Sequence, residues 1–146
     1  MNRRNLVQSA ALSASATFLV ASNAQGIGAT GQKHYKIVIQ VSDNDPVKWN
    51  LALNNTKNLQ ADVGAANVDV EIVAYGPGID MLKFGAEVEN RVSDAVARGV
   101  HVVACENTMH GHKLTQADMN PSVGYVPAGV TEIMKKQSEG WAYLRP

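Results

Sequence analysis

Short runs of β-branched and apolar residues alternate in this chain with segments whose apolar residues recur at helical spacing. Residues 35–41, 68–75 and 100–105 have the composition of strands, and the last of these runs is the most apolar. A helix of about ten to fifteen residues between two such strands is typical of a parallel pair. The alternation therefore predicts one α/β domain of three layers, with a mostly parallel sheet of about five strands and helices on both faces.

Capping residues predict where the helices begin and end. Asp45 followed by Pro46 is a helix start, because the carboxylate caps and proline needs no N–H partner in the first turn. Glycines close the first two helices, near Gly64 and at Gly99. For the rest of the chain we expect a helix over residues 107–117, a brief strand at 125–126, a last helix that opens at Pro127 and a closing strand at 141–144.

The first 24 residues are predicted to be a signal peptide. Arg3 and Arg4 give a positive start, residues 10–20 form a short apolar core, and small residues at positions 22 and 24 suit cleavage after Ala24. That core is too short and too rich in alanine and serine to span a bilayer permanently. We expect a periplasmic protein with no membrane segment in its mature form, a flexible leader at 25–34 and a single domain at 35–146.

The arginine pair also resembles the twin-arginine export signal, in which two arginines precede an apolar pair. Here Leu6 and Val7 provide that pair, but Asn2 stands where the usual pattern has serine or threonine. Paired arginines also occur in ordinary secretory signals. Both export routes therefore remain open.

Charge and loop composition exclude two classes of function. The chain has 13 basic and 13 acidic residues, and its only basic pair outside the signal peptide is Lys135-Lys136, so nucleic-acid binding is not expected. The loop after the first strand lacks the glycine-rich cradle that a nucleotide or flavin phosphate needs. No cofactor is predicted.

Cys105 is the only cysteine, and in an oxidising compartment an odd thiol requires an explanation. It lies at the carboxyl end of the most apolar strand, where parallel sheets bind their ligands. The following residues read as the first turn of a helix, whose amides favour a thiolate, whereas Glu106 would oppose it if its carboxylate pointed inward. The position predicts a thiol of moderate reactivity.

Other interpretations compete for the same part of the chain. Cys105, Met109 and His112 are spaced i, i+4 and i+7, a soft ligand set that would suit Cu(I). His101 is expected to be a partly buried, hydrogen-bonded residue rather than a base. Asp43 and Asp45 are expected mainly to cap the first helix, although they lie at the same sheet edge.

Several segments resemble the DsrE/DsrF-like family, and most closely its exported members. These are residues 99–109, which include Ala104-Cys105-Glu106-Asn107-Thr108-Met109, together with 74–82, 126–133 and 140–143. The resemblance covers residues 35 to 146 and implies a DsrE-like, flavodoxin-like topology. Characterised relatives are oligomeric sulfur-relay proteins that accept a sulfane sulfur on one cysteine at the end of this same strand, and that cysteine corresponds to Cys105.

The resemblance thus implies a homo-oligomer that carries sulfur on Cys105 between a donor and an acceptor protein. Asn107 and Thr108 would contribute first-turn hydrogen-bond donors to the bound group. No catalytic triad or pair of carboxylates accompanies the cysteine, so the chain is at most a sulfur carrier or transferase. The alternative is a non-catalytic oligomeric binding module in which Cys105 only packs.

Overall fold

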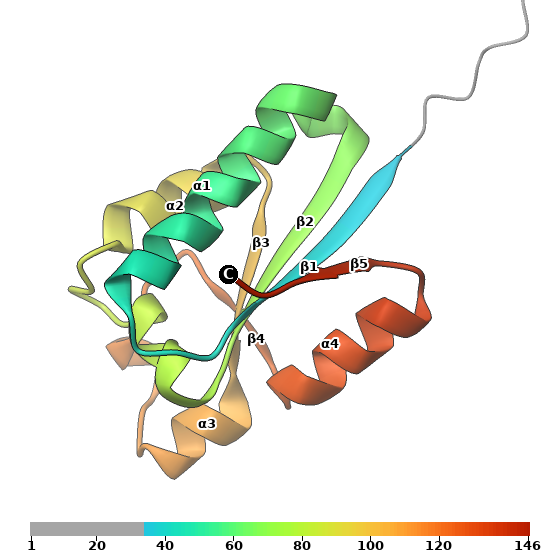
Figure 1. Cartoon of the computed structure of the whole chain (residues 1–146). Helices are drawn as coiled ribbons and strands as arrows, with labels where there is room; N and C mark the ends of the chain where they lie inside the picture. Colours follow the sequence, from blue (N-terminus) through green and yellow to red (C-terminus); the bar gives the residue numbers. More distant parts are fainter. Residues whose placement is uncertain (1–33) are drawn as a thin grey trace, which may run out of the picture. The chain divides into compact units, whose positions relative to one another are not determined.

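The computed structural model describes residues 34–146, which form one α/β domain around a five-stranded sheet (Figure 1). The predicted signal peptide and nearly all of the predicted leader lie outside the described residues. Within residues 34–146, no helix is both long and apolar enough to cross a membrane.

All strand pairings in the sheet are parallel, and the strand order is β4-β3-β2-β1-β5. The strands are β1 (Tyr35–Val41), β2 (Val68–Ala74), β3 (His101–Cys105), β4 (Gly124–Val126) and β5 (Ala142–Leu144). The α-helices are α1 (Pro46–Val63), α2 (Glu89–Ala97), α3 (Glu106–Gly111) and α4 (Gly129–Ser138), with 3-10 helices η1 (Ala65–Asn67), η2 (Gly76–Leu82) and η3 (Gln116–Asp118). The predicted α/β class and parallel sheet are confirmed.

Helices cover both faces of the sheet, as the sequence predicts. α1 and α2 pack on one face over the larger core cluster, which includes Ile39 and Ile72. α4 packs on the other face, where Ile133 meets Val38 and Val73. Figure 1 shows the α1–α2 pair and α4 on opposite sides of the strands.

The winding of the chain determines which face each connection covers. From β1 to β4 the strands are added in one direction, and β5 then returns to the far edge beside β1. This order differs from the 2-1-3-4-5 of flavodoxin. Because crossovers between parallel strands are right-handed, the reversal of direction after β4 places α4 on the face opposite to α1 and α2.

The first helix starts as predicted, and the third ends earlier than predicted. Asp45 caps α1, since its Oδ1 accepts a hydrogen bond from the Val47 N–H at 2.9 Å. The helix predicted over 107–117 ends at Gly111. The reason is a turn at Lys113, whose φ of 56° is left-handed, after which Thr115 and Asp118 form a capping box that starts η3.

One buried ion pair lies between the sheet and α4. Glu71 in β2 is 4% exposed, and its Oε2 lies 2.7 Å from the Nζ of Lys136 in α4. The same ammonium lies over the Trp141 ring, 4.3 Å from its centroid. Burial is the largest influence on Glu71 and raises the pKa of its carboxyl, although Lys136 partly opposes that shift.

Candidate functional site

Cys105 ends β3 at the topological switch point of the sheet. The connection after β3 stays on the α1–α2 face, where Met109 of α3 joins the core, whereas the connection after the neighbouring β4 leads into α4 on the other face. Cys105 is the register partner of Val126, the last residue of β4. Open parallel sheets bind ligands at the carboxyl edge where adjacent connections diverge in this way.

The Cys105 side chain lies on the α4 face of the sheet and is surrounded by hydrogen-bond donors. Alternation along β3 places it on the same face as Val103, which packs against the smaller core cluster. Cys105 is the N-cap residue of α3 but makes no capping bond of the usual geometry. The groups that lower the pKa of its thiol are the Thr108 side chain and the backbone amides of Gly129, Thr108 and Asn107.

These donors decide the direction in which the thiol titrates. Burial leaves Cys105 only 5% exposed and by itself raises the pKa of the thiol, because a thiolate loses its hydration. The hydrogen bonds from Thr108 and from the amides favour the anion and more than offset burial. The pKa of Cys105 therefore lies below its ordinary value, and Glu106, whose carboxylate would oppose this shift if it pointed inward, is exposed.

Gly129 allows the first turn of α4 to approach the sulfur. A Cβ at this position would lie 3.0 Å from the Tyr75 Cβ and 3.2 Å from a Val73 methyl carbon, so any larger residue would require these neighbours or the helix to shift by a few tenths of an ångström. A second contact joins the two connections, because the Asn107 N–H donates to the Pro127 carbonyl oxygen at 3.2 Å. The starts of α3 and α4 are thereby held together around the thiol.

The two predicted donors, Asn107 and Thr108, contribute through different groups. Asn107 has an exposed side chain, and its backbone amide lowers the pKa of the thiol although its N–H donates to the Pro127 carbonyl oxygen. Thr108 contributes both its amide and its hydroxyl. The Thr108 hydroxyl oxygen also accepts a hydrogen bond at 3.0 Å from the N–H of Gly76, at the end of β2.

The side chains proposed as a copper site lie in different surroundings. Met109 is buried in the core cluster on the α1–α2 face, opposite to the face that Cys105 occupies. His112 is exposed and follows the last residue of α3. Among residues 34–146 there is no group of three histidine, cysteine or acidic side chains that could hold a metal ion.

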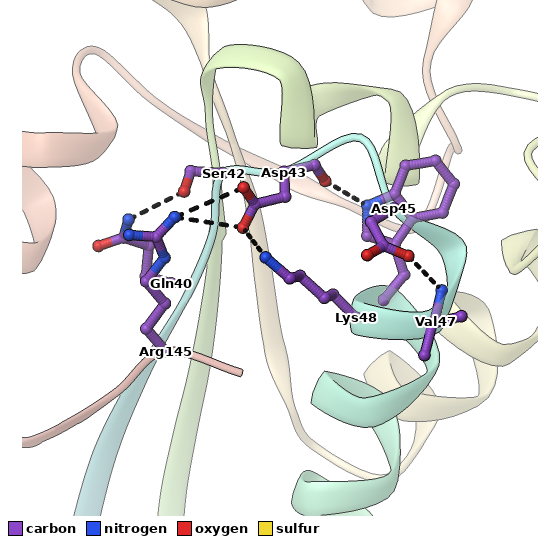
Figure 2. Close-up of polar contacts among 8 residues, drawn as sticks. Gln40, Ser42, Asp43, Asp45, Val47, Lys48 and Arg145 are labelled. Atoms are coloured by element: carbon purple, nitrogen blue, oxygen red, sulfur yellow. Dashed lines mark hydrogen bonds and ion pairs between the residues drawn. The ribbon is translucent and has the colours of Figure 1, made fainter.

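Two predictions about neighbouring polar residues are wrong. His101 is exposed rather than partly buried, because α4 covers β1 and β2 and leaves the start of β3 open on that face. Asp43 does not cap α1: Figure 2 shows its carboxylate between Lys48 and Arg145. The Lys48 Nζ lies 3.0 Å and the Arg145 Nη2 3.3 Å from Asp43 Oδ2, and both cations lower the pKa of this carboxyl.

The sequence analysis missed the contribution of α4 to the site. Gly129 stands in a Pro-Ala-Gly segment that reads as an ordinary helix start, and nothing local indicates that its amide meets Cys105. Tyr75, which packs against Gly129, is predicted from the sequence only as the end of a strand. The only available signal was topological, since adjacent strands with divergent connections bring two helix starts together.

Comparison with known proteins places this architecture among relatives. The model of the DsrE/DsrF-like family matches residues 35–146. A protein of unknown function from Methanobacterium thermoautotrophicum has a similar solved structure, with 35% identity, a TM-score of 0.73, and coverage of 77% of this chain and 99% of the other. The curated proteins contain no match.

Two further solved structures share the fold at low identity. The ychN protein of E. coli is 12% identical, with a TM-score of 0.63 and coverage of 78% of this chain and 99% of the other. A conserved protein of unknown function from Bacteroides thetaiotaomicron is 13% identical, with a TM-score of 0.59 and coverage of 76% and 94%. On the family match and the identity to the Methanobacterium protein, this chain belongs to the DsrE/DsrF-like family.

Proposed function

We propose that this protein is an exported sulfur carrier that holds a sulfane sulfur as a persulfide on Cys105. The observation that carries the proposal is the set of donors around the sulfur at the switch point of the sheet, which lowers the pKa of the thiol despite burial. A thiolate is the form of cysteine that attacks sulfur. Family membership supports sulfur as the cargo.

The transfer step needs only a thiolate and a persulfide donor. The Cys105 sulfur attacks the terminal, sulfane sulfur of a donor R–S–SH, and a new S–S bond forms on Cys105. The S–S bond of the donor breaks, and the electron pair leaves with R–S⁻. No external oxidant or reductant takes part, because the sulfane sulfur keeps its oxidation state.

The partners and location follow from the same proposal. The donor is a persulfide on a partner protein or a small polysulfide, and the acceptor is a second thiol protein. Export follows from the signal-like residues 1–24, and assembly into a homo-oligomer from the likeness to oligomeric relatives. Light scattering of the purified protein measures the assembly, and a monomeric mass at micromolar concentration would contradict it.

Mass spectrometry of protein incubated with polysulfide tests the function. The proposal expects a mass increase of one sulfur atom that maps to Cys105, is removed by a reductant and is absent from Cys105→Ser. Glutathione in the same solution is the control for reagent activity. If glutathione is modified while Cys105 is not, the thiol is structural, and the protein is better described as an oligomeric binding module.

A further inference from the structure

A small polar cleft lies between α1 and α2, on the face of the sheet opposite to Cys105. The two helices lie side by side (Figure 1), and the cleft has a volume of about 120 Å³. Its charged lining residues are Lys57 from α1, Arg91 and Asp94 from α2, and Arg98, which directly follows α2. Three cations against one carboxylate give the cleft a positive potential.

The cations of this cleft are not neutralised by the domain itself. Among residues 34–146, no carboxylate forms an ion pair with Lys57, Arg91 or Arg98. Asp94 lines the same cleft without an ion pair, so it reduces the positive potential but occupies none of the three cations. A concave surface of one sign of charge raises the local concentration of counter-ions. The cleft is therefore expected to attract an anion.

Arg91 is held in a fixed orientation by neutral groups. Its Nη1 donates to the side-chain oxygen of Asn50, and its Nη2 donates to that of Asn54 at 2.6 Å, both in α1. An amide oxygen orients a guanidinium without cancelling its charge, whereas a carboxylate would do both. A guanidinium carries five N–H donors, so donors remain for a ligand after these two contacts.

A second contact between the helices fixes the other end of the cleft. The Nε2 of Gln60, a buried residue of α1, donates to the Arg98 carbonyl oxygen at 3.0 Å. Lys57 lies one turn before Gln60 in α1. Leu53, which is 1% exposed, forms an apolar part of the wall. The cleft is thus a fixed feature of the helix pair, and its apolar wall strengthens attraction between charges by excluding water.

We propose that the cleft between α1 and α2 binds a small dianionic oxyanion, of the class of sulfate, thiosulfate and hydrogen phosphate. A double negative charge matches the excess of cations over carboxylate in the lining. A tetrahedral ion presents oxygens in several directions, which suits donors from two helices, and the fork of a guanidinium binds two such oxygens at once. This site is separate from Cys105 and does not rest on the proposed function.

Calorimetric titration with sodium sulfate tests the site, with the ionic strength held constant by sodium chloride. We expect a saturable isotherm with one sulfate per chain. Lys57→Met keeps the side chain long and removes its charge, so sulfate should bind roughly tenfold more weakly, as for the loss of one hydrogen bond to a charged group. Asp94→Asn removes the repelling carboxylate, and sulfate should bind roughly threefold more tightly. Both positions are exposed, so neither change should prevent folding.

Matched variants separate a site from an effect of net charge. Lys135→Met in α4 and Asp62→Asn in α1 make the same changes of charge at exposed positions outside the cleft. Both should bind sulfate with the wild-type affinity. If these two variants shift the affinity as much as the cleft variants do, sulfate responds only to net charge, and the inference is overturned. An isotherm that does not saturate would overturn it as well.

Two further titrations define the ligand and its independence from the thiol. If polyglutamate binds and sulfate does not compete with it, the cleft recognises an acidic polypeptide, and the inference is refuted. Cys105→Ser should bind sulfate with the wild-type affinity, because the thiol lies on the other face of the sheet. Loss of sulfate binding in Cys105→Ser would place the ion elsewhere and refute the assignment to this cleft.

Discussion

Replacement of Lys136 by methionine is predicted to destabilise the protein in a strongly pH-dependent way. Methionine preserves the apolar stem beside Trp141 but removes the ammonium that lies 2.7 Å from Glu71 Oε2. Loss of one partner of a buried ion pair costs about 3–5 kcal/mol, because the other charge stays buried and unpaired. With the lysine side chain 19% exposed and that of the glutamate 5% exposed, we expect the lower end of this range.

Proton uptake by Glu71 limits this cost and sets its dependence on pH. From an ordinary pKa of 4.5, protonation of the carboxyl at neutral pH costs about 3.4 kcal/mol, and each unit of pH removes about 1.4 kcal/mol. Burial raises the pKa of Glu71 in the native state, so stability from this group increases as pH falls through that pKa. The free energy of unfolding should fall by about 3 kcal/mol near pH 7 and by only about 1 kcal/mol near pH 5.

Urea unfolding of the wild-type and Lys136→Met proteins at several pH values measures both quantities. Lys135→Met, a change at the exposed neighbour in α4, is the control for loss of one positive charge. Glu71→Gln combined with Lys136→Met removes both charges and should recover most of the loss. A Lys136→Met protein within about 0.5 kcal/mol of wild type near pH 7, or a difference that does not shrink near pH 5, would refute the reasoning.

Two further predictions concern the edge of the sheet. Gly129→Ala brings a Cβ to 3.0 Å from Tyr75, so the overpacking cost of about 1–3 kcal/mol should exceed the gain in helix propensity of up to about 1 kcal/mol, and the protein should be less stable. Iodoacetamide labelling of the thiol should also slow, because the α4 amide withdraws from the sulfur. In the control variant Gly111→Ala the new Cβ meets no atom within 4 Å, so neither the stability nor the labelling rate should change. Asp43→Asn should lower the melting temperature slightly, because Arg145 loses its partner. If high salt does not change the melting temperature of the wild-type protein, the ion pair makes no ionic contribution to stability.

The central elements of the fold could be predicted because their signals are local. The β-branched runs of β1, β2 and β3 and the Asp45-Pro46 helix start are each contained in a few consecutive residues. The end of α3 could not be predicted in this way, because residues 107–117 have adequate helical composition. A left-handed Lys113 and a capping box at Thr115 end the helix there, after Met109 has joined the core.

The candidate site shows the same division between local and distant information. Cys105 could be located because strand end and helix start coincide in the sequence, and Thr108 could be suggested because it lies in the first turn. The exposure of His101 depends on how far α4 extends across the sheet, and the ion pairs of Asp43 depend on where Arg145 lies after the last strand. Neither the exposure of His101 nor the ion pairs of Asp43 can be predicted from the residues next to them in the sequence.

The strand order explains why position 105 has surroundings that its neighbours lack. Because β3 and β4 are adjacent while their connections leave to opposite faces, two helix starts meet at one point of the sheet edge. Their amides concentrate partial positive charge on whatever side chain ends β3. Most of these donors are backbone groups, which substitutions at Asn107 or Gly129 can displace but not remove. Cysteine is the residue type that converts such an environment into nucleophilicity, so Cys105→Ser should keep the fold and the donors and abolish the labelling by iodoacetamide.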